Sequence, residues 1–170
     1  DRKDVMLWMD VANQIYGDST QMVVHGISMG GATTMMISGE TQPDYVKCFV
    51  DDCGYTSVWD QFSKELKEDF GIPAFPILYT SSWLCDLTKG WNFTEASSLE
   101  QVKKCQLPML FIHGEKDDYV QTWMVHELYK AKPQPKEIWV VPGADHATSY
   151  KLNKEEYTQK VKQFTEKYIQ

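Results

Sequence analysis

A G-x-S-x-G pentapeptide at residues 26–30 constrains this chain more than any other feature. It follows a short apolar run at residues 21–25, whose β-branched centre is typical of a buried parallel strand, and it precedes a stretch of small residues typical of a helix start. A strand that turns sharply into a helix at this pattern presents its serine in a strained backbone conformation. We therefore predict a strand, a tight turn that carries Ser28 as a nucleophile, and a helix.

The two glycines of the pentapeptide are predicted to have a steric role. A side chain at Gly26 or Gly30 is expected to collide with the tight turn, so that only a hydrogen atom fits at either position. Ser28 itself is expected near a disfavoured region of backbone conformation.

Two further motifs follow in the C-terminal half of the chain. The apolar run at residues 108–112 ends in a polar turn that carries Asp117, and the run at residues 137–141 ends in a loop that carries His146. Both residues come just after the carboxyl end of an expected strand, where open parallel sheets place their active sites. With Ser28 they stand in the order nucleophile, acid, histidine.

The patterns H-G-x-x-D-x-x-V at residues 113–120 and P-G-A-x-H-x-x-S-Y at residues 142–150, together with the pentapeptide, resemble the α/β-hydrolase superfamily. They are most similar to its bacterial serine-hydrolase branch, which includes serine aminopeptidases, acylglycerol lipases and small esterases. The resemblance covers nearly the whole chain. It implies an α/β fold, a parallel sheet with flanking helices, that runs from the nucleophile strand to the C-terminal helix and is therefore only part of the hydrolase fold.

A catalytic serine needs a base within hydrogen-bond reach, because its hydroxyl is a poor nucleophile at its own pKa. His146 has the setting of that base, in a loop at the end of a strand. The other histidines of the chain are expected to be structural, which applies to His25, His113 and His126.

The acid of the triad has two candidate positions, because carboxylate pairs follow two of the expected strands. The resemblance implies Asp117, the aspartate four residues after the histidine at the strand end. A minority of α/β-hydrolase lipases place the acid one strand earlier, so Asp52 or Asp51 stays open as the alternative.

The oxyanion hole is expected to include the backbone N–H of Met29, the residue after the nucleophile. The second donor of such sites normally comes from a loop after an earlier strand. Residues 1–20 instead have the spacing of a single amphipathic helix, which matches the helix before the nucleophile strand in the resembling family. We therefore expect residues 1–170 to be the C-terminal portion of one α/β-hydrolase domain, with an unpaired strand edge at residues 22–24 through which this piece could associate.

The region at residues 57–104 is the least regular and is expected to include a cap segment. It starts with an amphipathic helix over about 59–70 and continues through stretches rich in aromatic and apolar residues. Two interpretations stay open: a further helix buried against the sheet, or a cap that walls an apolar pocket over Ser28.

Composition excludes some classes of protein. The formal net charge is −7, and no cluster of Lys and Arg is present, so nucleic acid is not an expected partner. No apolar stretch approaches the length of a membrane span. Four cysteines lack the spacing of a metal site or a disulfide framework and are expected to be buried thiols, which weakly favours the cytoplasm.

The function expected from these features is hydrolysis of carboxylic esters by a Ser28-His146-Asp117 triad through an acyl-enzyme, with short acyl chains as the leading substrate class. This chemistry requires no metal and no organic cofactor, and its substrate is a small-molecule ester or a peptide. One alternative is a peptidase resembling the prolyl oligopeptidase group, which shares Gly30-Gly31 after the serine. The other is a catalytically silent α/β-hydrolase fold used for binding.

Overall fold

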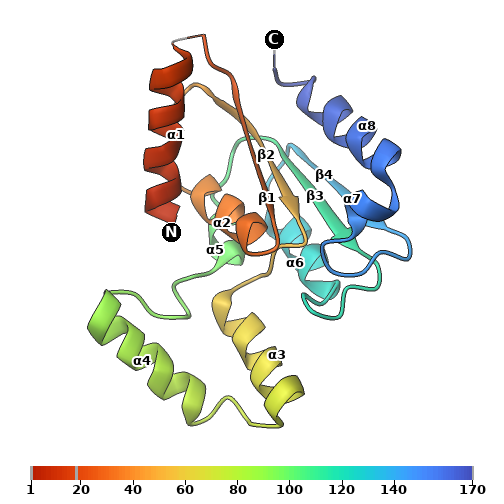
Figure 1. Cartoon of the computed structure of the whole chain (residues 1–170). Helices are drawn as coiled ribbons and strands as arrows, with labels where there is room; N and C mark the ends of the chain where they lie inside the picture. Colours follow the sequence, from red (N-terminus) through yellow and green to blue (C-terminus); the bar gives the residue numbers. More distant parts are fainter. Residues whose placement is uncertain (1, 18, 170) are drawn as a thin grey trace.

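Helices and strands alternate along most of the chain in a computed structural model that describes residues 2–17 and 19–169. Figure 1 labels these elements on the ribbon. Their bounds are α1 (Arg2–Tyr16), β1 (Met22–Ile27), α2 (Met29–Ser38), β2 (Val46–Asp52), α3 (Val58–Phe70), α4 (Ile77–Lys89), α5 (Ser98–Val102), β3 (Met109–Gly114), α6 (Trp123–Ala131), β4 (Lys136–Val141), α7 (Ser149–Leu152) and α8 (Lys154–Thr165).

The four strands form one parallel sheet in the order β1-β2-β3-β4. This arrangement confirms the predicted α/β fold class. In the register of the sheet, Ile27 pairs with Asp52, Asp52 with Ile112, and Gly114 with Val141. The loops after β1, β2, β3 and β4 therefore open at the same edge of the sheet, and these loops carry the predicted site residues.

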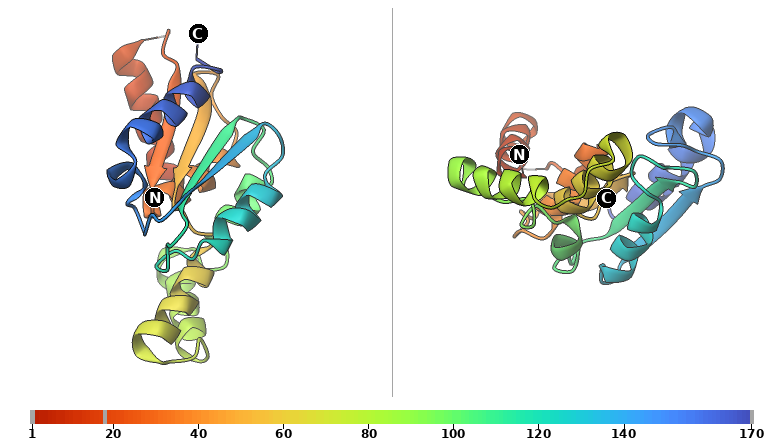
Figure 2. Two further views of the ribbon diagram at one scale, coloured as in Figure 1. Left: turned by 90° about the vertical axis from the view of Figure 1, so that its right-hand side faces the viewer. Right: turned by 90° about the horizontal axis from the view of Figure 1, so that it is seen from below.

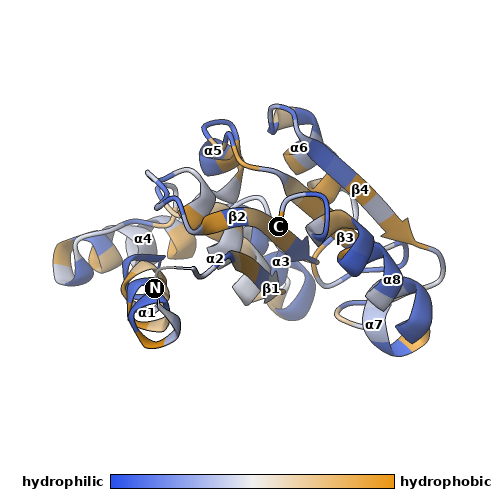
Figure 3. Cartoon of the chain, turned by 90° about the horizontal axis from the view of Figure 1, so that it is seen from above, coloured by the Kyte–Doolittle hydropathy of each residue, from blue (hydrophilic) through white to orange (hydrophobic). Residues whose placement is uncertain are grey.

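Both faces of the sheet are covered, which gives the domain two hydrophobic clusters. The alternation of side chains along β3 divides them: Met109 and Phe111 face α2, α5 and α6, whereas Leu110 and Ile112 face α8. The hydropathy colouring of Figure 3 marks the strands as the most apolar part of the ribbon. Burial on both faces explains why the strands read as continuous apolar runs.

The helices α3 and α4 lie beyond the carboxyl edge of the sheet, away from its two faces (Figures 1 and 2). Only Leu78 and Ser82 are buried along the whole of α4. Within residues 57–104, α3 and α4 thus stand away from the sheet, whereas Val102 of α5 packs in the hydrophobic core. The region exposes several large apolar side chains: Phe62, Phe70, Phe75, Ile77, Tyr79, Trp83, Leu84, Leu87 and Trp91.

Among the described residues, no helix combines the length and the apolar character needed to cross a membrane.

The edge strand β1 gives a prediction about association. In the described part of the chain, β1 pairs with β2 on one side only. Unpaired backbone N–H and C=O groups along a strand edge are a template for another strand. We expect the 170-residue chain made alone to form dimers or larger species whose fraction rises with protein concentration. Light scattering over a concentration series checks this, and a monodisperse monomer throughout would contradict it.

Candidate active site

Ser28 lies at the sharp turn between β1 and α2. Its backbone has φ 55° and ψ −117°, a conformation that residues other than glycine rarely adopt. The Ser28 N–H donates to the Asp52 carbonyl at 2.8 Å, and the Ser28 carbonyl accepts from Ala32 N–H at 3.0 Å. The strained turn that the pentapeptide predicts is therefore confirmed, and the neighbouring strand holds it in place.

The glycines of the turn are only partly as predicted. A Cβ atom at Gly26 would collide with the Gly30 carbonyl group, which confirms the steric role of Gly26. The same role for Gly30 is wrong, because a Cβ there meets no heavy atom within 4 Å. The crowded second glycine is Gly31, where a Cβ would collide with the Asp51 carboxylate of β2. The close approach of α2 to β2, rather than the turn itself, requires this glycine.

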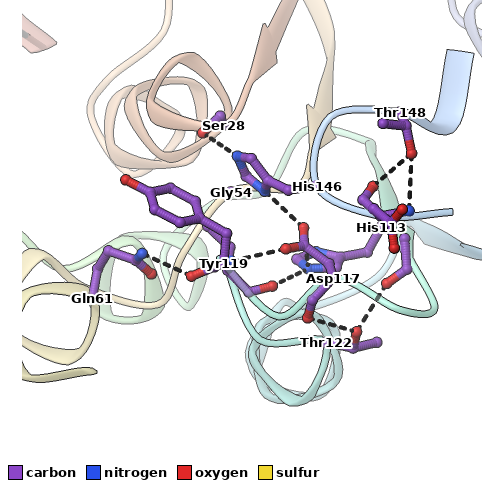
Figure 4. Close-up of polar contacts among 12 residues, drawn as sticks. Ser28, Gly54, Gln61, His113, Asp117, Tyr119, Thr122, His146 and Thr148 are labelled. Atoms are coloured by element: carbon purple, nitrogen blue, oxygen red, sulfur yellow. Dashed lines mark hydrogen bonds and ion pairs between the residues drawn. The ribbon is translucent and has the colours of Figure 1, made fainter. Parts of the chain in front are cut away.

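The three predicted catalytic side chains meet at the carboxyl edge of the sheet (Figure 4). Ser28 Oγ lies 2.8 Å from His146 Nε2, and His146 Nδ1 lies 2.8 Å from Asp117 Oδ2. Since a carboxylate can only accept, Nδ1–H donates to Asp117, and Nε2 is left to accept the hydroxyl proton of Ser28. This is the tautomer that a general base requires. The Asp117 side chain is fully buried, whereas 20% of the His146 side chain is exposed.

Asp117 is held by the turn that follows β3. Its Oδ1 accepts from Val120 N–H at 2.8 Å, and its Oδ2 lies 2.8 Å from His146 Nδ1 and 3.4 Å from His113 Nε2. The fully buried His113 lies beside Asp117, and its Nε2 forms a hydrogen bond of 2.8 Å with the Val120 carbonyl oxygen. Burial lowers the pKa of His113, so this imidazole is neutral and does not neutralise the nearby carboxylate. The structural role expected for His113 is therefore supported by its contacts.

Asp52 and Asp51, the alternative acids, form their hydrogen bonds with groups other than His146. Asp52 Oδ2 accepts from the Tyr157 hydroxyl at 2.8 Å, and that hydroxyl lies 3.0 Å from His25 Nε2. Asp51 Oδ1 accepts from Gly54 N–H at 3.1 Å. Burial raises the pKa of Asp52 to about 6, with partial compensation from the Tyr157 hydrogen bond. Burial, and then the charge of Asp52, raises the pKa of Asp51 as well. These carboxyls are costly to ionise.

The raised pKa of Asp52 predicts a pH-dependent stability. The folded state binds the Asp52 proton more tightly than the unfolded state, so the free energy of unfolding falls as pH rises from about 4 to about 6. A shift from 3.8 to about 6 corresponds to about 3 kcal/mol. Asp52→Asn mimics the neutral form, and we expect its stability relative to wild type to increase by about 2 kcal/mol between pH 4 and pH 7. Urea unfolding at both pH values measures this difference, which would be constant if Asp52 ionised normally.

Tyr119 is a site residue that the sequence analysis missed. Its ring lies 4.9 Å from the ring of His146, with the two planes tilted by 58°. The same residue contacts α3, because its carbonyl accepts from Gln61 Nε2 at 2.9 Å and its ring lies 5.4 Å from Lys64 Nζ. Figure 4 shows Tyr119 between Gln61 and His146. Its place two residues after Asp117, in the turn that carries the acid, is the only signal in the sequence.

Comparison with known proteins relates the whole chain to one family. A model of the prolyl oligopeptidase family matches residues 1–170. Among curated proteins, the uncharacterized protein YqkD of Bacillus subtilis (strain 168) is 30% identical over 141 residues, which are 83% of this chain and 46% of that protein. The chain thus spans about half the length of this relative.

Solved structures similar to this one include hydrolases of two kinds. The esterase Pf2001 of Pyrococcus furiosus superposes with a TM-score of 0.72 at 21% identity, over 98% of this chain and 61% of that one. The acylaminoacyl peptidase of Pyrococcus horikoshii also gives a TM-score of 0.72, at 16% identity, over 99% of this chain and 28% of that one. At these identities the likeness concerns the fold, which is that of α/β hydrolases.

Proposed function

Because the chain belongs to the prolyl oligopeptidase family, we propose that it acts as a serine hydrolase in which Ser28, His146 and Asp117 form the catalytic triad. The observation that carries this proposal is the continuous chain of two hydrogen bonds, each 2.8 Å long, from Ser28 Oγ through the imidazole to Asp117 Oδ2. Three residues separated by up to 118 positions in sequence have no structural need to align in this way at the end of a sheet.

In this mechanism Ser28 Oγ attacks the carbonyl carbon of the substrate while His146 Nε2 takes the hydroxyl proton. Asp117 holds the imidazole and stabilises the imidazolium that forms. The developing oxyanion accepts from the backbone N–H of Met29, which stands at the start of α2, where the helix N-terminus favours negative charge. His146 then gives that proton to the leaving group. In the second half of the reaction His146 takes a proton from a water molecule that attacks the acyl carbonyl, the bond to Ser28 Oγ breaks, and Ser28 regains its proton as the acid product leaves.

The substrate class we propose is carboxylic esters with apolar acyl groups. The residues on either side of the nucleophile, Ile27 and Met29, are 49% and 65% exposed, and Tyr119 next to His146 is 47% exposed. An apolar acyl chain would cover these side chains, and small-molecule sites are lined mostly by such groups. Residues 57–104, with their exposed aromatic side chains beyond the sheet edge, would act as the cap of this site.

A peptidase is the second candidate, and the family match favours it. The chain belongs to the prolyl oligopeptidase family, and one similar structure is an acylaminoacyl peptidase. The same triad cleaves amides when the site positions the amine as leaving group. The two candidates differ in the substrate that they take rather than in the residues that act.

Paired substrates distinguish the two candidates. We expect p-nitrophenyl butyrate to be hydrolysed with a higher kcat/KM than aminoacyl p-nitroanilides, because the exposed surface next to Ser28 is apolar. The assay uses the longest natural form of the protein, with Ser28→Ala as the blank for non-enzymatic hydrolysis. Faster turnover of the anilides would instead assign the peptidase.

A further inference from the structure

Cys53 lies next to the triad, although the mechanism does not use it. It follows β2 directly, its side chain is fully buried, and its backbone has φ 51° in the left-handed region. The Cys53 N–H donates to the Ile112 carbonyl at 2.8 Å, which ties this strained residue to β3. A strained residue that surrounding contacts hold beside a reactive centre is a candidate for a functional role.

The thiol sulfur lies close to possible ligand atoms of two triad residues. Cys53 Sγ, a carboxylate oxygen of Asp117 and a ring nitrogen of His146 all lie within 4.8 Å of one another. In a tetrahedral zinc site the ligand atoms stand about 3.5 Å apart, so these atoms need to draw together by at most roughly 1.3 Å. The partly exposed His146 ring gives a path from solvent.

We propose that Cys53, His146 and Asp117 form an inhibitory site for a thiolate-seeking divalent cation such as Zn²⁺ or Cd²⁺. The set of one sulfur, one imidazole nitrogen and one carboxylate oxygen suits these cations and not Mg²⁺ or Ca²⁺, which prefer oxygen ligands throughout.

Occupation of this site removes the base of the triad. On binding, the thiol proton is released to solvent, and sulfur, nitrogen and oxygen each donate an electron pair to the cation. Coordination at His146 Nε2 consumes the lone pair that accepts from Ser28. Coordination at Nδ1 displaces that proton to Nε2, which then has no lone pair to offer. In both cases Ser28 can no longer be deprotonated. This inhibition rests on the proposed function, whereas binding of the cation does not.

Inhibition by Cd²⁺ tests the proposal, with Cys85→Ala as the matched control. Cys85 is a partly exposed thiol on α4 and is remote in sequence from the triad. We expect Cd²⁺ and Zn²⁺, but not Mg²⁺, to inhibit p-nitrophenyl butyrate hydrolysis, and Cys53→Ser to raise the inhibition constant at least about tenfold. Rates with and without Cd²⁺ are compared within each variant, so that changes in basal rate cancel. Equal inhibition constants in wild type, Cys53→Ser and Cys85→Ala would overturn the proposal.

A spectroscopic measurement separates binding from catalysis. In the Ser28→Ala protein, titration with Cd²⁺ is expected to produce the ultraviolet charge-transfer absorption of a thiolate–cadmium bond, and Ser28→Ala/Cys53→Ser is expected to lose it. This result holds even if the protein hydrolyses no ester, so failure of the proposed function is distinguishable from failure of the site. The same absorption in both proteins would place the cation on another thiol and overturn the proposal, as would binding that leaves hydrolysis unaffected.

Discussion

Ser28→Ala and His146→Ala are each expected to lower kcat for p-nitrophenyl butyrate by about 10⁴- to 10⁶-fold. Ser28 Oγ supplies the electron pair of the new bond to the substrate. Among the described residues, His146 Nε2, 2.8 Å away, is the only base that forms a hydrogen bond with this oxygen. Members of a triad act as a unit, so the double variant is expected to lose little more than either single variant. Steady-state rates measure both effects, and circular dichroism checks that each variant is folded.

The acid is tested by a matched pair of isosteric changes. We expect Asp117→Asn to lower kcat by about 10⁴-fold, because an amide at the 2.8 Å contact no longer fixes the proton on His146 Nδ1. Asp52→Asn changes a neighbouring strand end but leaves this contact intact, and its effect on kcat is expected to be small. A large loss for Asp52→Asn with a mild one for Asp117→Asn would reverse the assignment of the acid.

Labelling by a fluorophosphonate decides between an enzyme and a binding protein. The probe reacts with a serine only where a base activates it. We expect Ser28 to be labelled in wild type and unlabelled in His146→Ala. A folded wild-type protein that is not labelled would favour the catalytically silent alternative.

The positions of the catalytic candidates could be predicted from sequence because each of them follows the carboxyl end of a strand. Strand ends are local features, marked by an apolar run and the polar or glycine residue after it. The parallel order of the sheet then brings Ser28, Asp117 and His146 to one edge without further information. The choice of Asp117 over Asp52 could not be made from strand ends alone, since both residues follow strands. It depended on the resemblance of the turn that carries Asp117 to the α/β-hydrolase superfamily.

Contacts between distant segments could not be predicted in the same way. Tyr119 contacts the ring of His146, 27 positions later in the sequence, only because two loops converge. Cys53 reads as an ordinary buried thiol until its distance to Asp117 is known. The requirement for a glycine at position 31 arises from the packing of α2 against β2, which no local pattern records. Each of these features depends on tertiary packing rather than on the spacing of residues.

Gly26→Ala is expected to disable the site, and Gly30→Ala is its matched control. Both glycines flank the nucleophile in the same pentapeptide. An alanine Cβ at position 26 would collide with the Gly30 carbonyl and would also lie 2.6 Å from Thr34 Oγ1, so the backbone of the turn must shift. We expect a loss of about 3 kcal/mol or more in the free energy of unfolding. At position 30 the added methyl meets open space, so the expected change is within about 1 kcal/mol and favours the helix.

The same pair of variants separates strain from catalysis at Ser28. A turn displaced by about 1 Å would cost on the order of 100-fold in the rate of acylation, because Ser28 Oγ would leave the line to His146 Nε2. The rate of fluorophosphonate labelling, measured at a temperature where both variants are folded, reports that displacement directly. Gly26→Ala should therefore label far more slowly than wild type. If instead Gly30→Ala were less stable than Gly26→Ala, a collision with the Gly30 carbonyl would not be the reason that position 26 requires a glycine.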